Sequence, residues 1–99
     1  MKTTLALLAS ILTTTPATAQ EATRALAHMI VAEQFCAIAA PERFAAYVAN
    51  NALAETGMTG PQLTQAGYAA AGEIGRAYAQ QGTLGAFCAN IRNIYEGLE

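Results

Sequence analysis

The sequence predicts an all-α protein, a compact and mostly antiparallel bundle of about four short helices. Apolar residues recur at helical spacing across residues 21–98, and no strand-like alternation of any length accompanies them. Prolines and glycines separate these periodic runs at short intervals, as expected for tight turns between neighbouring helices. The chain has two cysteines, Cys36 and Cys88, which we expect to join the first and last helices of the mature chain.

Residues 1–19 have the ordered parts of a secretory signal peptide. Met1-Lys2 form a short basic start, an apolar run follows at positions 5–12, and an A-x-A motif ends at Ala19. The apolar run is too short to cross a bilayer, which needs about 20 residues. We therefore expect cleavage between Ala19 and Gln20, leaving residues 20–99 as a single helical domain without a membrane span. The alternative is that this segment is an apolar helix of the fold.

The first helix is predicted from Glu21 to Ala40, because a proline at position 41 disfavours helical backbone in the residue before it. Pro41 itself suits the first turn of a second helix, which we expect to continue to about Thr56. Gly57 is then placed to adopt the left-handed conformation that commonly ends a helix.

Thr59 and Gln62 have capping-box spacing on either side of a Gly-Pro pair, which predicts a third helix that runs to about Gln81. Three small residues recur every four positions along this helix: Gly67, Ala71 and Gly75. We expect this strip to pack closely against a neighbouring helix of the same domain. The alternative is a groove for a partner.

The fourth helix follows Gly82, and its apolar residues have the most regular helical spacing in the chain. The stripe consists of Leu84, Phe87, Ile91, Ile94 and Leu98. Cys88 and Tyr95 lie beside it.

The two cysteines predict a disulfide rather than a reactive site. An even cysteine count in a short exported chain indicates a disulfide framework, and two cysteines allow one pairing. Closing a loop of about 50 residues stabilises a fold by roughly 4 kcal/mol in the chain-entropy model. A redox-active or metal-binding pair is the alternative, but Cys36 and Cys88 form neither a C-x-x-C motif nor a local cysteine–histidine cluster. Disulfide and leader together indicate the bacterial periplasm, with full secretion as the alternative.

Composition argues against two classes of partner. Residues 20–99 contain four arginines, no lysine and seven glutamates, a formal charge of −3 with histidine neutral. This acidity argues against nucleic acid, which requires a basic face, and against an anionic membrane surface. Twenty of these 80 residues are alanine, which favours helix but buries little area. The core should therefore be thin, and the stability of the fold should depend on the disulfide.

The sequence predicts no catalytic site, no metal site and no cofactor, and hence a protein that is not an enzyme. His28 is the only histidine, and no serine, aspartate or cysteine nucleophile accompanies it in an interpretable motif. We interpret His28 as a partly buried helix residue. The alternative is a general base or pH sensor, and a hydrolase or redox enzyme would require His28 or the cysteines to be reactive.

The four tyrosines are the candidate interaction residues, because tyrosine is enriched at protein interfaces. They are Tyr47, Tyr68, Tyr78 and Tyr95. The alternative is that each covers an edge of the thin core with its hydroxyl in water.

The layout resembles that of the HdeA-type acid-stress chaperones of the periplasm. The shared features are a signal peptide, a small helical mature domain and two cysteines about 50 residues apart, here Cys36 and Cys88. The resemblance implies a fold that loosens as carboxylates gain protons, near about pH 2 to 3. The chain is also similar to small single-disulfide helical proteins of the periplasm, some of which act as immunity proteins against toxins.

We therefore expect a non-catalytic protein that binds another periplasmic protein through helix surfaces. The first alternative is an acid- or stress-responsive chaperone. The second is an immunity or inhibitor protein directed against a periplasmic toxin or enzyme.

Overall fold

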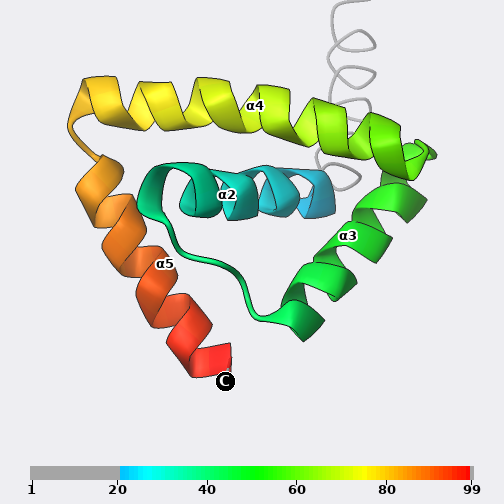
Figure 1. The fold of residues 1–99 in the computed structure, drawn as a ribbon, viewed down its shortest axis with the longest axis horizontal. Helices are drawn as coiled ribbons and strands as arrows, with labels where there is room; N and C mark the ends of the chain where they lie inside the picture. The colour runs from blue at the N-terminus through cyan, green and yellow to red at the C-terminus, as the bar shows by residue number, and fades with distance from the viewer. Residues whose placement is uncertain (1–20, 99) are drawn as a thin grey trace, which may run out of the picture.

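The computed structural model describes residues 21–98, which form four α-helices and confirm the all-α prediction (Figure 1). The helices are α2 (Glu21–Cys36), α3 (Glu42–Thr56), α4 (Gly60–Gln81) and α5 (Leu84–Leu98). The predicted signal peptide and its cleavage site between Ala19 and Gln20 lie outside the described residues.

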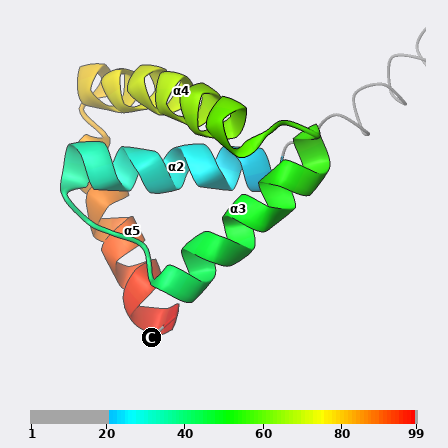
Figure 2. The ribbon, with the colours of Figure 1, turned by 45° about the vertical axis from the view of Figure 1, so that its right-hand side comes forward.

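α2 and α4 lie side by side and run in the same direction (Figures 1 and 2). α3 and α5 lie at opposite ends of this pair, and their far ends, the start of α3 and the end of α5, approach each other. Gly67 of α4 lies against Leu26 and Ile30 of α2, and Gly75 lies against Phe35, so the contacts advance together along both helices. The expectation of a mostly antiparallel arrangement is therefore wrong for the central pair. α3 carries the chain back to the end where α2 begins, so α4 starts there as well.

The small-residue strip of α4 packs inside the domain, as predicted. Gly67, Ala71 and Gly75 are all buried. A Cβ atom on Gly67 would lie 2.9 Å from the Cδ1 atom of Ile30, and one on Gly75 would overlap the ring of Phe35. The missing side chains thus let α2 approach α4 closely, and the strip is not a free groove.

The structure confirms the predicted signals at the end of α3 and at both ends of α4. Gly57 and Gly82 follow their helices with φ angles of 69° and 75°. The Thr59 hydroxyl accepts a hydrogen bond from the Gln62 amide at 3.3 Å, and the Gln62 side chain accepts one from the Thr59 amide at 3.0 Å. This capping box fixes the start of α4.

The first helix ends at Cys36, four residues before the predicted end at Ala40. Ala37 adopts a φ of 57°, which is unfavourable for a residue with a Cβ atom. The chain then crosses to α3 and places Ile38 and Ala40 against the core. Pro41 predicted a later end, but the helix stops at Cys36, and Ile38 and Ala40 of the connection pack against the second core cluster.

Two small apolar clusters form the core. The first joins α2 to α4 and consists of Ile30, Val31 and Ala71, with Leu26, Ile74, Tyr78 and Phe87 around them. The second joins α2 to α5 and consists of Ala32, Ile91 and Tyr95, with Ile38, Ala40, Phe44 and Phe87 around them. Among the described residues, the largest fully buried side chain is Val31. The core is therefore thin, as its composition predicts.

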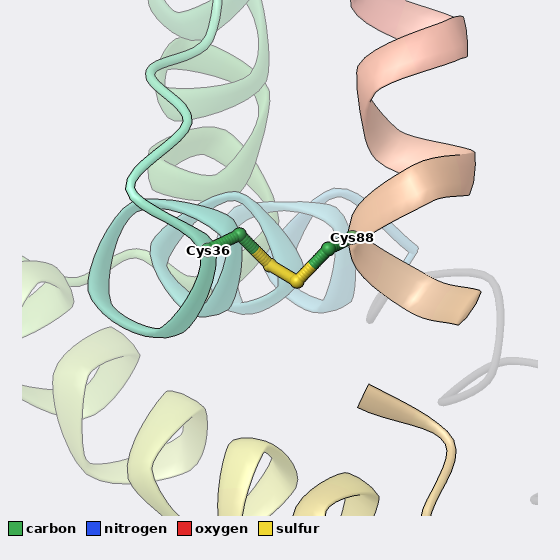
Figure 3. Close-up of a disulfide and its surroundings, with 2 residues drawn as sticks. All are labelled: Cys36 and Cys88. Carbon is green, nitrogen blue, oxygen red and sulfur yellow. A yellow bond between two sulfur atoms is a disulfide. The ribbon is translucent and has the colours of Figure 1, made fainter. Parts of the chain in front are cut away.

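The predicted disulfide is present and links α2 to α5 (Figure 3). Cys36 and Cys88 are 52 positions apart in sequence, and their Cα atoms are separated by 5.6 Å. The bond holds the start of α5 at the end of α2. The bond therefore keeps α5 beside the C-terminal end of α2, directly before the 37–41 connection.

Candidate interaction site

The four tyrosines do not share one surface. Tyr47 on α3 is 68% exposed and Tyr68 on α4 is 46% exposed. Tyr78 is half-buried between helices. The structure corrects the assignment of Tyr95, which is 5% exposed and belongs to the core, so it offers no side chain to a partner. Tyr47 and Tyr68 remain as candidate contact residues.

Tyr95 lies in the second core cluster, where its ring packs 6.2 Å from that of Phe44 between centroids. Its hydroxyl is buried and has no hydrogen-bond partner within the described part of the chain. Burial raises the pKa of the Tyr95 hydroxyl above its usual value, and the nearby carboxylate of Glu33 raises it further. This group is thus an unsatisfied donor inside the fold.

His28 takes part in a small aromatic cluster between α2, α4 and α5. Its Nδ1 atom donates to the Arg24 carbonyl at 2.9 Å, because a carbonyl oxygen can only accept. Its Nε2 atom then accepts from the Tyr78 hydroxyl at 3.2 Å in the neutral ring. The Tyr78 ring stacks on Phe87 at 4.9 Å. Both nitrogens of His28 are therefore engaged within the fold, which supports its interpretation as a partly buried helix residue.

A groove with a volume of about 400 Å³ lies between α2 and α3, and Tyr47 borders it. Its other lining residues are Glu21, Ala22, Ala25, Phe44, Val48, Asn51 and Glu55. Ala22 and Ala25 of α2 and Phe44 and Val48 of α3 supply its apolar lining, and Glu21, Asn51 and Glu55 supply acidic and amide groups. We define these eight residues as the α2–α3 groove.

Glu55, which lies near the end of α3 and lines the groove, caps the N-terminus of α2 with its carboxylate. Its Oε2 atom accepts from the Ala22 amide at 3.1 Å, and its Oε1 atom accepts from the amides of Ala22 and Thr23 at 3.2 and 3.4 Å. A carboxylate near the first turn satisfies free N–H groups and complements the helix dipole. Sequence reasoning missed this cap because the residues are 32 and 33 positions apart.

No group of three histidine, cysteine, aspartate or glutamate side chains among residues 21–98 is arranged to hold a metal ion. Within the same range, none of the helices combines the length and apolarity needed to cross a membrane.

Comparison with known proteins gives no family assignment. No protein-family model, no curated protein and no solved structure matches the chain. The α2–α3 groove and the exposed Tyr47 that lines it are the features of the described residues that best fit an interaction site.

Proposed function

We propose that this chain is a non-catalytic exported protein that binds another protein through its helix surfaces, with the α2–α3 groove as the contact site. One observation carries the proposal: Tyr47 is 68% exposed and lines a groove that also contains the apolar residues Ala25 and Phe44. Aromatic side chains that combine an apolar ring and a wet hydroxyl are typical contact residues of protein interfaces.

The geometry of the groove supports binding of a side chain rather than catalysis. Ala25 and Phe44 contribute apolar area to its lining, and Glu21, Asn51 and Glu55 contribute polar groups. An apolar lining with a few hydrogen-bonding groups is the usual composition of a recognition pocket. The one histidine lies elsewhere, bonded to Arg24 and Tyr78.

The test is quantitative capture from cells under non-reducing conditions. Tagged wild-type protein is compared with Tyr47→Ala and with Tyr68→Ala, an exposed tyrosine outside the groove. We expect one protein to be enriched with the wild type and with Tyr68→Ala, and to be lost with Tyr47→Ala. Equal enrichment with all three proteins, or no enrichment with any, contradicts the proposal.

A second function, an acid-responsive chaperone, is favoured by a separate observation. The core is thin, and Val31 is the largest fully buried side chain among the described residues, so little apolar burial opposes loosening of the fold. Residues 20–99 contain seven glutamates and four arginines, so strong acid gives the chain a net positive charge and favours expansion.

Dye binding and client aggregation measured from pH 7 down to pH 2 test the chaperone function. The chaperone function requires dye binding to rise and aggregation of an acid-denatured client to fall below about pH 4, where model carboxylates become protonated. Glu55→Gln, which lacks the charge at every pH, should move this transition toward neutral pH. A fold and dye signal constant across the range contradicts the chaperone function and leaves the binding function in place.

A further inference from the structure

The charged groups of the α2–α3 groove are carboxylates, which accept hydrogen bonds. Its charged residues are Glu21 and Glu55, and among the described residues that line it there is no arginine or lysine. The Asn51 amide nitrogen donates to the Tyr47 carbonyl at 2.7 Å, and the Asn51 side-chain oxygen adds a further acceptor to the groove. We propose that the groove binds an arginine side chain of the partner protein, an inference that rests on the proposed function.

The carboxylate of Glu55 has room for a further donor. Its Oε1 atom has three contacts, with the Ala22 amide, the Thr23 amide and the Thr23 hydroxyl, whereas its Oε2 atom has the Ala22 amide alone. Each carboxylate oxygen has about two acceptor positions, so Oε2 can accept from a further donor. The three backbone contacts, at 3.1 to 3.4 Å, also orient the carboxylate before a partner group binds.

An arginine matches this arrangement better than other residues do. The guanidinium group has five N–H donors and no acceptor, and it bonds carboxylates in a planar, forked geometry. Its planar face stacks on aromatic rings, and the ring of Tyr47 is the exposed aromatic surface at the groove. The methylene stem of an arginine would lie against the apolar lining at Ala25 and Phe44, which are partly exposed.

The net charge of the chain acts in the same direction. Residues 20–99 have a formal charge of −3, and an acidic surface raises the encounter rate with a basic partner at low salt. Binding should therefore weaken as ionic strength rises, because salt screens exposed charges. A hydrophobic contact alone would not weaken in this way.

The probes are two capped five-residue peptides that differ in one group. One has a central arginine flanked by leucines, and the other has citrulline, which keeps the shape and removes the charge. The ¹⁵N-labelled protein is expressed with its leader, purified in the processed form that the cell makes, and titrated with each peptide by NMR. We expect amide shifts confined to residues 21–25 and 44–55, and about tenfold weaker binding of the citrulline peptide.

Variants locate the contact on the protein. Tyr47→Ala and Glu21→Gln should each weaken binding of the arginine peptide by about five- to tenfold, because they remove the stacking face and one charge. The matched controls are Tyr68→Ala and Glu73→Gln, exposed residues of α4 that do not line the groove. Neither control should change the affinity. Glu21 is used instead of Glu55 because Glu55 also caps α2.

Three results overturn the inference: equal affinity for both peptides, shifts outside the groove, or no shifts at millimolar peptide. These results separate the arginine site from the proposed function. A partner captured through Tyr47 by a protein that does not distinguish arginine from citrulline would keep the binding function and reject the arginine contact. Loss of capture together with specific arginine binding would reject the binding function alone.

Discussion

The ring of Phe35 in α2 lies directly over Gly75 in α4, where a Cβ atom would overlap it. Phe35 is 36% exposed, so its ring can turn toward solvent when a methyl group is added. We predict that Gly75→Ala lowers the free energy of unfolding by about 1 to 2 kcal/mol through lost burial of the ring. Urea unfolding followed by circular dichroism measures the change.

Gly72 is the control for this substitution, because it lies in the same helix and its added Cβ would meet only the flexible end of Arg76, at 3.4 Å. Gly72→Ala should raise stability by about 0.5 to 1 kcal/mol, since alanine is the better helix former. In a Phe35→Ala background, Gly75→Ala should become neutral or stabilising. An unchanged loss in that background would mean that Phe35 is not the cause.

The cap that Glu55 places on α2 predicts a second effect. Glu55→Gln removes the negative charge beside the amides of Ala22 and Thr23, and we expect it to lower stability by about 1 kcal/mol near neutral pH. Glu73→Gln, an exposed change on α4, is the control and should alter stability by less than about 0.5 kcal/mol. Equal effects of the two variants would show that the cap contributes nothing.

Ala37 adopts the left-handed conformation, with a φ of 57°. Glycine has no Cβ penalty there, so Ala37→Gly should raise stability by about 1 kcal/mol. Gly57→Ala provides the reciprocal test, because its φ is 69° and no atom lies within 4 Å of an added Cβ. Gly57→Ala should lower the free energy of unfolding by about 1 kcal/mol. Thermal unfolding of both variants should show a higher midpoint for Ala37→Gly and a lower midpoint for Gly57→Ala. A loss in Ala37→Gly would contradict the described end of α2.

The buried hydroxyl of Tyr95 predicts a loss of stability in alkali. Its pKa is raised by burial and by Glu33, so above about pH 10 the unfolded chain loses this proton while the folded chain retains it. Stability should be constant with respect to this group below pH 10 and fall as the pH rises above it. Tyr95→Phe should remove that part of the fall.

The same substitution has an effect at neutral pH. Tyr95→Phe deletes an unpartnered hydroxyl and keeps the packing against Phe44, so stability at pH 7 should be unchanged or higher by about 1 kcal/mol. Unfolding in urea at pH 7 and pH 11 gives both values. A clear loss at pH 7 would show that the hydroxyl has a partner in solution.

Helical spacing predicted where α5 lies in the sequence, but it did not determine the face that is buried. Ile91 and Tyr95 are buried, whereas Ile94 and Leu98 are 46% and 48% exposed. The disulfide fixes Cys88 toward α2, so residues three and seven positions later face the core as well. Helical periodicity alone predicts a broad apolar stripe on α5. The disulfide determines which edge of that stripe, the one with Ile91 and Tyr95, faces the core.

Sequence signals that act within a few residues predicted three helix ends, and of the long-range contacts the sequence predicted the disulfide and the packing of the α4 strip. Thr59, Gly57 and Gly82 act within a few residues, and each has its predicted role. The α2–α3 groove and the Glu55 cap depend on how two helices meet, which no local pattern encodes. The early end of α2 at Cys36 has the same cause, because the 37–41 connection is shaped by its packing against α5.

Site-specific photo-crosslinking in living cells tests the central claim, that the α2–α3 groove contacts a partner protein. A photoreactive residue replaces Tyr47 in one variant, and Tyr68 on α4 or Arg92 on α5 in two others, all three being exposed positions. The account predicts a discrete crosslinked product from position 47 and none from positions 68 and 92. A product from position 68 or 92 without one from position 47 would contradict it.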